Sequence, residues 1–171
     1  MTTFKLFNMK KLVLLSMLFF AVSAMQAQEI KVGAHVGIPV GDSSDGSNFD
    51  LGADVAYLFS PVEMLQFGPM IGFSHYFTEE IDYDGMASVD PPDASFLPIA
   101  ASGRVSLGDA VFVGADLGYA VGLSDGNDGG FYYRPKLGFD LLGLWVVGSY
   151  EGISMDGGSV SSVNVGLEFG F

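Results

Sequence analysis

Residues 163–171 read VNVGLEFGF and decide the fold class of this chain. Val163, Val165, Leu167 and Phe169 alternate with polar residues or glycine, so the segment has one apolar side and one side that is not apolar. Successive side chains of a β-strand point to opposite faces, whereas the apolar residues of an amphipathic helix recur about every 3.6 residues. We therefore predict a strand that separates two different environments.

The same alternation recurs upstream, and we predict eight strands in all. They are expected at residues 30–40, 49–59, 65–76, 96–105, 111–122, 131–141, 144–153 and 160–171. Short connections are expected at 60–64, 106–110 and 142–143, and longer ones, rich in Gly, Asp and Ser, at 41–48, 77–95, 123–130 and 154–159. This all-β pattern predicts an eight-stranded antiparallel up-and-down transmembrane β-barrel, because only closure satisfies every backbone group in lipid.

Three prolines interrupt the pattern. Pro69, Pro98 and Pro135 lie inside predicted strands, although proline cannot donate a hydrogen bond to a sheet. The apolar residues of the segment at 144–153 are also divided between its two faces. The pairing registers at these places are left open.

The composition excludes several classes of protein. The chain has 171 residues, of which 49% are hydrophobic and 13% aromatic, with 20 acidic residues against 7 basic ones. The apolar content argues against a disordered acidic chain, and the few basic residues argue against a nucleic-acid partner. Cysteine is absent, which excludes disulfides and cysteine nucleophiles. The length favours one folded domain.

The N-terminal segment has the layout of a secretory signal peptide. Basic residues precede an apolar run at 12–22, and small residues follow at Ala24 and Ala27. The run is about half of the ~20 residues that a membrane-spanning helix requires. We expect a cleaved signal peptide at 1–27 and a barrel domain at 28–171, with cleavage after Ala24 as the alternative.

The two faces of the strands predict which side of the barrel meets lipid. The face opposite the apolar one consists mostly of Gly, Ala and Ser with a few charges, whereas a solvent-exposed face should be crowded with Lys, Glu and Thr. Small residues suit the narrow lumen of an eight-stranded barrel, which side chains fill without an open pore. The alternative is a secreted, soluble, lipocalin-like barrel whose apolar face surrounds a small apolar ligand.

Charged residues on the small-residue face are expected to form a buried ion-pair network, because an unpaired charge in a low-dielectric interior is costly. Strand order predicts that Lys31 meets Glu168 and that Glu151 reaches Arg134. His35 is expected to point into the lumen beside an aspartate. The predicted network comprises Lys31, Asp50, Asp54, Arg104, Asp116, Arg134, Lys136, Asp140, Glu151 and Glu168.

A family resemblance appears at the C-terminus. The alternation that ends in Phe169 and Phe171 resembles the C-terminal strand by which bacterial outer-membrane barrels are recognised for assembly. With its signal peptide and eight strands, the chain resembles the small outer-membrane β-barrel proteins typified by OmpA and OmpX. The resemblance implies an outer-membrane location with periplasmic termini, contact with outer-membrane lipid and lipopolysaccharide, and assembly by the barrel-assembly machinery, with Phe169 and Phe171 as the assembly signal.

The expected role is structural or a cell-surface interaction, by a monomer without a cofactor. Catalysis is not expected: Ser74 and His75 are neighbours in a strand and face opposite sides, which disfavours direct proton transfer between them. The longest loop, 77–95, is a candidate for contact with a surface partner.

The long loops are acidic and contain one candidate metal site. Asp125, Asn127 and Asp128 offer oxygen atoms of the kind that calcium prefers. The alternative is a hydrophilic loop that binds only water, and the sequence favours this alternative.

Overall fold

A computed structural model describes residues 28–41, 47–78, 93–124 and 126–171. The expected signal peptide lies outside the described residues. Within these ranges, no helix has the length and apolar character that a helical membrane span needs.

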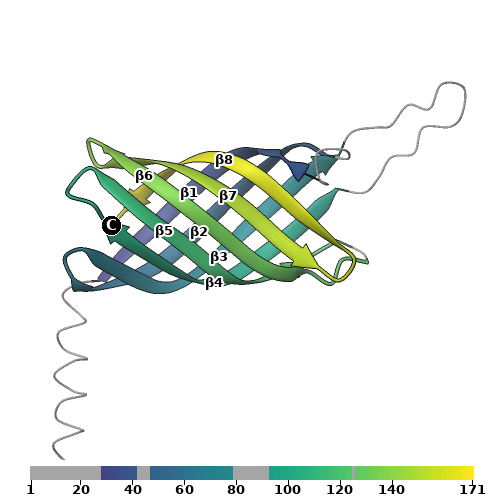
Figure 1. The fold of residues 1–171 in the computed structure, drawn as a ribbon, viewed down its shortest axis with the longest axis horizontal. Coiled ribbons are helices and arrows are strands. Elements are labelled where there is room, and N and C mark those ends of the chain that lie inside the picture. Colours follow the sequence, from purple (N-terminus) through teal and green to yellow (C-terminus); the bar gives the residue numbers. More distant parts are fainter. Residues whose placement is uncertain (1–27, 42–46, 79–92, 125) are drawn as a thin grey trace, which may run out of the picture.

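The described chain forms one closed antiparallel barrel in which each strand pairs with the next and β1 pairs with β8 (Figure 1). The strands cross the barrel obliquely, as closure of a sheet requires. Their bounds are β1 Gln28–Pro39, β2 Ser47–Val62, β3 Leu65–Thr78, β4 Ala94–Ser106, β5 Val111–Gly122, β6 Gly130–Leu141, β7 Leu144–Met155 and β8 Gly158–Gly170. All eight predicted strands are confirmed.

The two ends of the barrel differ in their connections. We call the end where β1 begins and β8 finishes the terminal end, and the opposite one the loop end. The three connections at the terminal end are short, as predicted. At the loop end, the predicted long connection at 154–159 is wrong, because β7 and β8 continue to a two-residue turn in which Gly157 has a φ of 107°. A positive φ is a conformation that glycine adopts at no steric cost, so the turn can be this tight.

The apolar face of each strand points outward. Along β1 the side chains alternate between exposed and buried: Val32, Val36 and Ile38 are exposed, whereas Lys31 and His35 are buried. Burial does not alternate clearly along β7, but its Glu151 is fully buried in the lumen. The outer surface is therefore an apolar wall, as the pattern predicts for a membrane barrel.

Pro69, Pro98 and Pro135 each interrupt the hydrogen-bond ladder on one side only. Beside Pro69, the paired residues of β2 and β3 skip between Ala56 and Phe59. The ladder between β3 and β4 skips Pro98, and that between β6 and β7 skips Pro135. Because proline has no N–H to donate, the strand keeps its pairing with the other neighbour and the barrel stays closed.

Aromatic side chains that are exposed or half-buried gather near both ends of the barrel. Phe49 and Phe77 stack near the loop end with ring centroids 4.3 Å apart, and Phe59 and Phe67 lie 6.4 Å apart near the terminal end. Phe49 and Phe67 are exposed, so these two rings are not part of a buried core. Two such belts are typical of proteins whose outer wall meets two membrane interfaces.

Candidate functional site

The middle of the lumen holds an ion-pair network centred on Arg134 of β6. Its Nη2 lies 2.9 Å from Asp54 Oδ2, and its Nε lies 3.0 Å from Asp116 Oδ2. Lys136 Nζ lies 2.8 Å from the other oxygen of Asp116. All four side chains are buried, so each charge has an opposite charge as partner inside the barrel.

Toward the terminal end, Arg104 and Glu168 form a second, bidentate pair. Arg104 Nη1 and Nη2 donate to the two carboxylate oxygens of Glu168 at 2.6 and 3.0 Å. The predicted pair between Lys31 and Glu168 is therefore wrong. Both residues do lie in the lumen, but Glu168 is opposite Gly33, and the planar guanidinium of Arg104 matches both of its oxygens. Lys31 Nζ instead lies 2.5 Å from Glu29 Oε1.

Toward the loop end, the buried carboxylate of Glu151 has hydroxyl partners. Tyr76 donates to its Oε1 at 3.1 Å, and Tyr132 donates to its Oε2 at 3.3 Å. The predicted contact of Glu151 with Arg134 is wrong, because the guanidinium is occupied by Asp54 and Asp116.

His35 lies in the lumen, as predicted. Its Nδ1 is 3.7 Å from Asp54 Oδ2, and its Nε2 is 3.8 Å from Glu151 Oε2. The aspartate expected beside this imidazole is therefore Asp54, and His35 lies between the carboxylates of two strands.

Two further predicted members of the network have different surroundings. Asp50 is fully buried beside Asn164, whose amide nitrogen, when oriented to satisfy its hydrogen bonds, donates to Asp50 Oδ2 at 2.9 Å. Asp140 is not part of the network, contrary to the prediction. It lies at the terminal end of β6, where its Oδ1 accepts a hydrogen bond from Gly143 N at 2.8 Å and fixes the turn.

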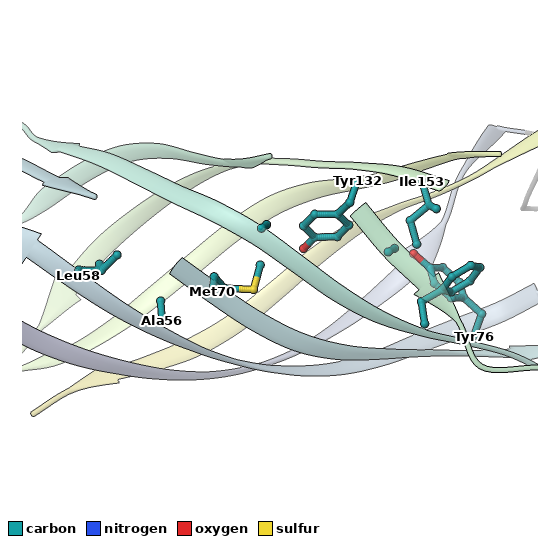
Figure 2. Close-up of a cluster of buried hydrophobic side chains, with 9 residues drawn as sticks. Ala56, Leu58, Met70, Tyr76, Tyr132 and Ile153 are labelled. Carbon is teal, nitrogen blue, oxygen red and sulfur yellow. The ribbon is translucent and has the colours of Figure 1, made fainter. Parts of the chain in front are cut away.

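Large apolar and aromatic side chains also fill the lumen, which the sequence pattern did not predict. Figure 2 shows Leu58, Met70, Tyr132, Ile153 and Tyr76 distributed along its interior. A cavity beside Arg134 has a volume of only about 20 Å³, which is room for about one water molecule. Among the described residues, side chains therefore plug the barrel.

A larger cavity of about 470 Å³ lies at the loop end. Its lining includes the apolar residues Phe96, Met155 and Val160 and the acidic residues Asp93, Asp128 and Asp156. This mixed lining differs from the apolar interior that a lipocalin-like carrier would need.

The candidate calcium loop is only partly described, because Asp125 lies outside the described residues. Asn127 Oδ1 accepts a hydrogen bond from Gly129 N at 3.0 Å, and the backbone oxygen of Asp128 accepts one from Tyr119 at 3.0 Å. In the part of the chain that the structure places, no three His, Cys, Asp or Glu residues are arranged to hold a metal ion.

His75 on the outer wall has polar partners that sequence reasoning missed. Its ring nitrogens face Ser95 and Asp93, which lie some twenty residues further along the chain. The strand register places His75 directly opposite Ser95, whereas Ser74, its neighbour in sequence, is buried in the lumen. Alternation correctly excluded Ser74 but could not supply the partner on the next strand.

The fold and the filled lumen define the class: a small eight-stranded barrel of the outer-membrane type. No protein-family model and no curated protein matches the sequence. Solved structures do match, which confirms the resemblance to small outer-membrane barrels.

Two of these structures are of Ail, the attachment invasion locus protein of Yersinia pestis. The crystal structure is 17% identical with a TM-score of 0.54, and the structure in a phospholipid bilayer nanodisc is 18% identical with a TM-score of 0.57. Each covers 85% of this chain and 99% of that chain. The N-terminal β-barrel domain of Pseudomonas aeruginosa OprF is 10% identical, with a TM-score of 0.50, and covers 84% of this chain and 97% of that one. At these identities the likeness shows the fold.

Proposed function

We propose that this chain is an integral outer-membrane protein with a plugged lumen that displays its acidic loops at the cell surface. The observation that carries the proposal is the arrangement of polarity across the wall. Large apolar side chains such as Val55, Ile71 and Phe131 are about half exposed on the outside, and nine Asp, Glu, Lys or Arg side chains of the described residues are buried inside. This arrangement suits a hydrocarbon solvent outside the barrel.

The same observation disfavours a soluble carrier. A lipocalin-like barrel would need an apolar cavity at its centre, but here Arg134, Asp54 and Asp116 occupy that space. If this barrel were dissolved in water, its outer wall would also expose a far larger apolar surface than soluble monomers normally expose.

The orientation follows from the connections. In membrane barrels the short turns face the periplasm and the longer loops face outward, so both termini would be periplasmic. The segment at 77–95 then becomes the candidate surface for a partner, and lipopolysaccharide would surround the loop end. We propose a monomer, because closure of the barrel leaves no unpaired strand edge among the described residues.

The C-terminal strand is proposed as the assembly signal read by the barrel-assembly machinery. The backbone N–H of Phe171 donates to Ile30 O at 2.9 Å, and Ile30 N–H donates to Phe171 O at 3.1 Å. The Phe169 and Phe171 side chains are exposed on the outside, where an assembly factor could bind them.

Fractionation of cells that express the full chain tests this proposal. We expect the protein in the outer-membrane pellet after an alkaline wash, with an electrophoretic mobility that changes on boiling. Phe171→Ala should lower the amount of folded protein in that pellet, whereas Phe139→Ala, which changes an exposed phenylalanine on β6 at the same end, should not. A periplasmic protein whose mobility is insensitive to heat would overturn the proposal.

The expectation that the chain has no catalytic activity stays a prediction. The polar cluster of His75, Ser95 and Asp93 is the place where this prediction can be tested.

A further inference from the structure

A serine, a histidine and an aspartate lie in contact on the outer wall near the loop end. His75 of β3 is directly opposite Ser95 of β4, and its Nδ1 lies 2.7 Å from Ser95 Oγ. Its Nε2 lies 3.4 Å from Oδ2 of Asp93, the residue before β4. A hydroxyl, an imidazole and a carboxylate in this order are the groups that activate a serine nucleophile.

Neighbouring groups hold the three residues in place. Thr78 donates to Asp93 Oδ1 from both its backbone N and its Oγ1, each at 2.9 Å, which leaves Oδ2 toward His75. Ser124 Oγ donates to the backbone oxygen of Asp93 at 2.9 Å and accepts from Ser95 N at 3.0 Å. Two adjacent elements therefore fix the acid and the hydroxyl against the ring, as a preorganised site requires.

The charge of the aspartate favours the imidazole tautomer that the chemistry needs. Hydrogen bonds from the backbone and side chain of Thr78 hold the pKa of Asp93 below its usual value, so the carboxylate is ionised. An ionised carboxylate beside Nε2 favours the proton on that nitrogen. Nδ1 of His75 is then free to accept the proton of Ser95.

The surroundings indicate which substrate could reach this site. The His75 ring is stacked with Phe73 at 6.3 Å and meets the edge of Phe77 at 4.4 Å. The side chains of His75 and Asp93 remain 24% and 45% exposed. Aromatic rings near a strand end mark the level of the lipid headgroups, below which the acyl chains begin. Ester bonds of membrane lipids lie at this level.

We propose that Ser95, His75 and Asp93 form a catalytic triad that hydrolyses a fatty-acyl ester of a lipid in the surrounding membrane. Ser95 Oγ forms a bond to the ester carbonyl carbon while its proton passes to His75 Nδ1. The bond from that carbon to the alcohol oxygen then breaks, and the alcohol leaves with the proton from His75.

Water completes the reaction. It adds to the acyl-serine and gives a proton to His75, and the bond to Ser95 Oγ breaks as that proton returns to the serine. The net reaction converts one ester and one water into a fatty acid and an alcohol. Asp93 orients the ring and stabilises the imidazolium in both halves.

The experiment measures fatty acid released by the full-length folded barrel in three kinds of vesicle. One contains ester-linked phospholipid, the second contains lipopolysaccharide, and the third contains ether-linked phospholipid without acyl esters. We expect release from one or both ester vesicles, which identifies the source of the ester, and none from the ether vesicles.

Variants test the assignment of roles. Ser95→Ala and His75→Asn should each lower the rate by about 10³-fold, and Asp93→Asn should lower it as well. Ser154→Ala, which changes an exposed serine on β7 near the same end, should keep the wild-type rate. A fluorophosphonate should label Ser95 in the folded protein, as located by peptide mass spectrometry, and fail to label Ser95→Ala.

The proposal fails if Ser95→Ala releases fatty acid at the wild-type rate, or if the folded wild-type protein releases none from either ester vesicle, whether or not Ser95 is labelled. Each variant is compared only after its heat-dependent mobility shows that it has folded. Membrane insertion is measured separately, so loss of the triad proposal would leave the proposed membrane location intact.

Discussion

Arg104 and Glu168 show how a charge is kept inside the barrel. They come from strands that are not neighbours, β4 and β8, and their bidentate contact spans the lumen. Sequence periodicity correctly predicted that both side chains face inward. It could not predict the pairing, because the reach of a long side chain across a lumen depends on barrel geometry and not on neighbouring registers.

Removing Glu168 should therefore leave a buried guanidinium without its carboxylate. We expect Glu168→Ala to lower the free energy of unfolding by about 3–5 kcal/mol. Urea titration of the barrel in lipid vesicles measures this change. Asp140→Ala serves as the control, because Asp140 is only half-buried at the barrel end, and its loss should cost much less. Equal effects of the two substitutions would show that Glu168 is not the carboxylate partner that stabilises buried Arg104.

The hydroxyl of Thr78 should contribute to the lowered pKa of Asp93, together with the backbone N–H of the same residue. Hydrogen bonds from Thr78 lower the pKa of Asp93, so they stabilise the folded state above the unfolded pKa, and this contribution is lost as pH falls through the folded pKa. Thr78→Val removes one of the two bonds and should raise the pKa of Asp93 toward its ordinary value. A carboxyl titration followed by NMR measures the shift, and an unchanged pKa would show that the hydroxyl contact is unimportant.

At the scale of the strands, the number, order and facing of the elements could be predicted from alternation alone. The turn between β7 and β8 could not, because Gly, Ser and Asp near 154–159 suit both a long loop and a tight turn with a positive φ at Gly157. The aromatic filling of the lumen was also missed. Phe112 stands on the glycine-rich face, where a glycine on the next strand makes room for its ring.

Gly138 of β6 is such a position. A Cβ added there would lie 2.1 Å from Cε1 of Phe112, on the neighbouring β5, whereas a Cβ at Gly148 of β7 would meet nothing within 4 Å. We expect Gly138→Ala to destabilise the barrel by about 1–3 kcal/mol through overpacking. Gly148→Ala should change stability by less than about 0.5 kcal/mol. Equal unfolding midpoints for the two variants would show that the ring does not need the space.

The whole molecule combines an apolar outside with a plugged inside. Buried ion pairs and the cluster around Tyr76, Tyr132 and Ile153 occupy the lumen along its length. The barrel class followed from the sequence because closure, alternation and strand number constrain one another. The polar cluster at His75 could not be predicted from the sequence, because it depends on the register between β3 and β4.

A plugged barrel should not conduct ions. We expect the purified protein to give no steady conductance in a planar bilayer, because the cavity in the lumen has room for only about one water molecule. An open porin of larger strand number is the positive control. Stable stepwise conductance from folded protein would contradict the filled lumen.

The claim that lipid surrounds the apolar wall is tested most directly by one substitution on that wall. Ile71 lies on β3 and is half exposed, opposite Val55 and Ile99 of the neighbouring strands. Leu107, which is equally exposed but lies in a turn at the terminal end, provides the control. The measurement is the free energy of unfolding in lipid vesicles. We expect Ile71→Arg to lower this free energy by about 2–4 kcal/mol and Leu107→Arg to lower it by no more than about 1 kcal/mol. Equal, negligible losses for both variants would mean that the apolar wall faces water and that lipid does not surround the barrel.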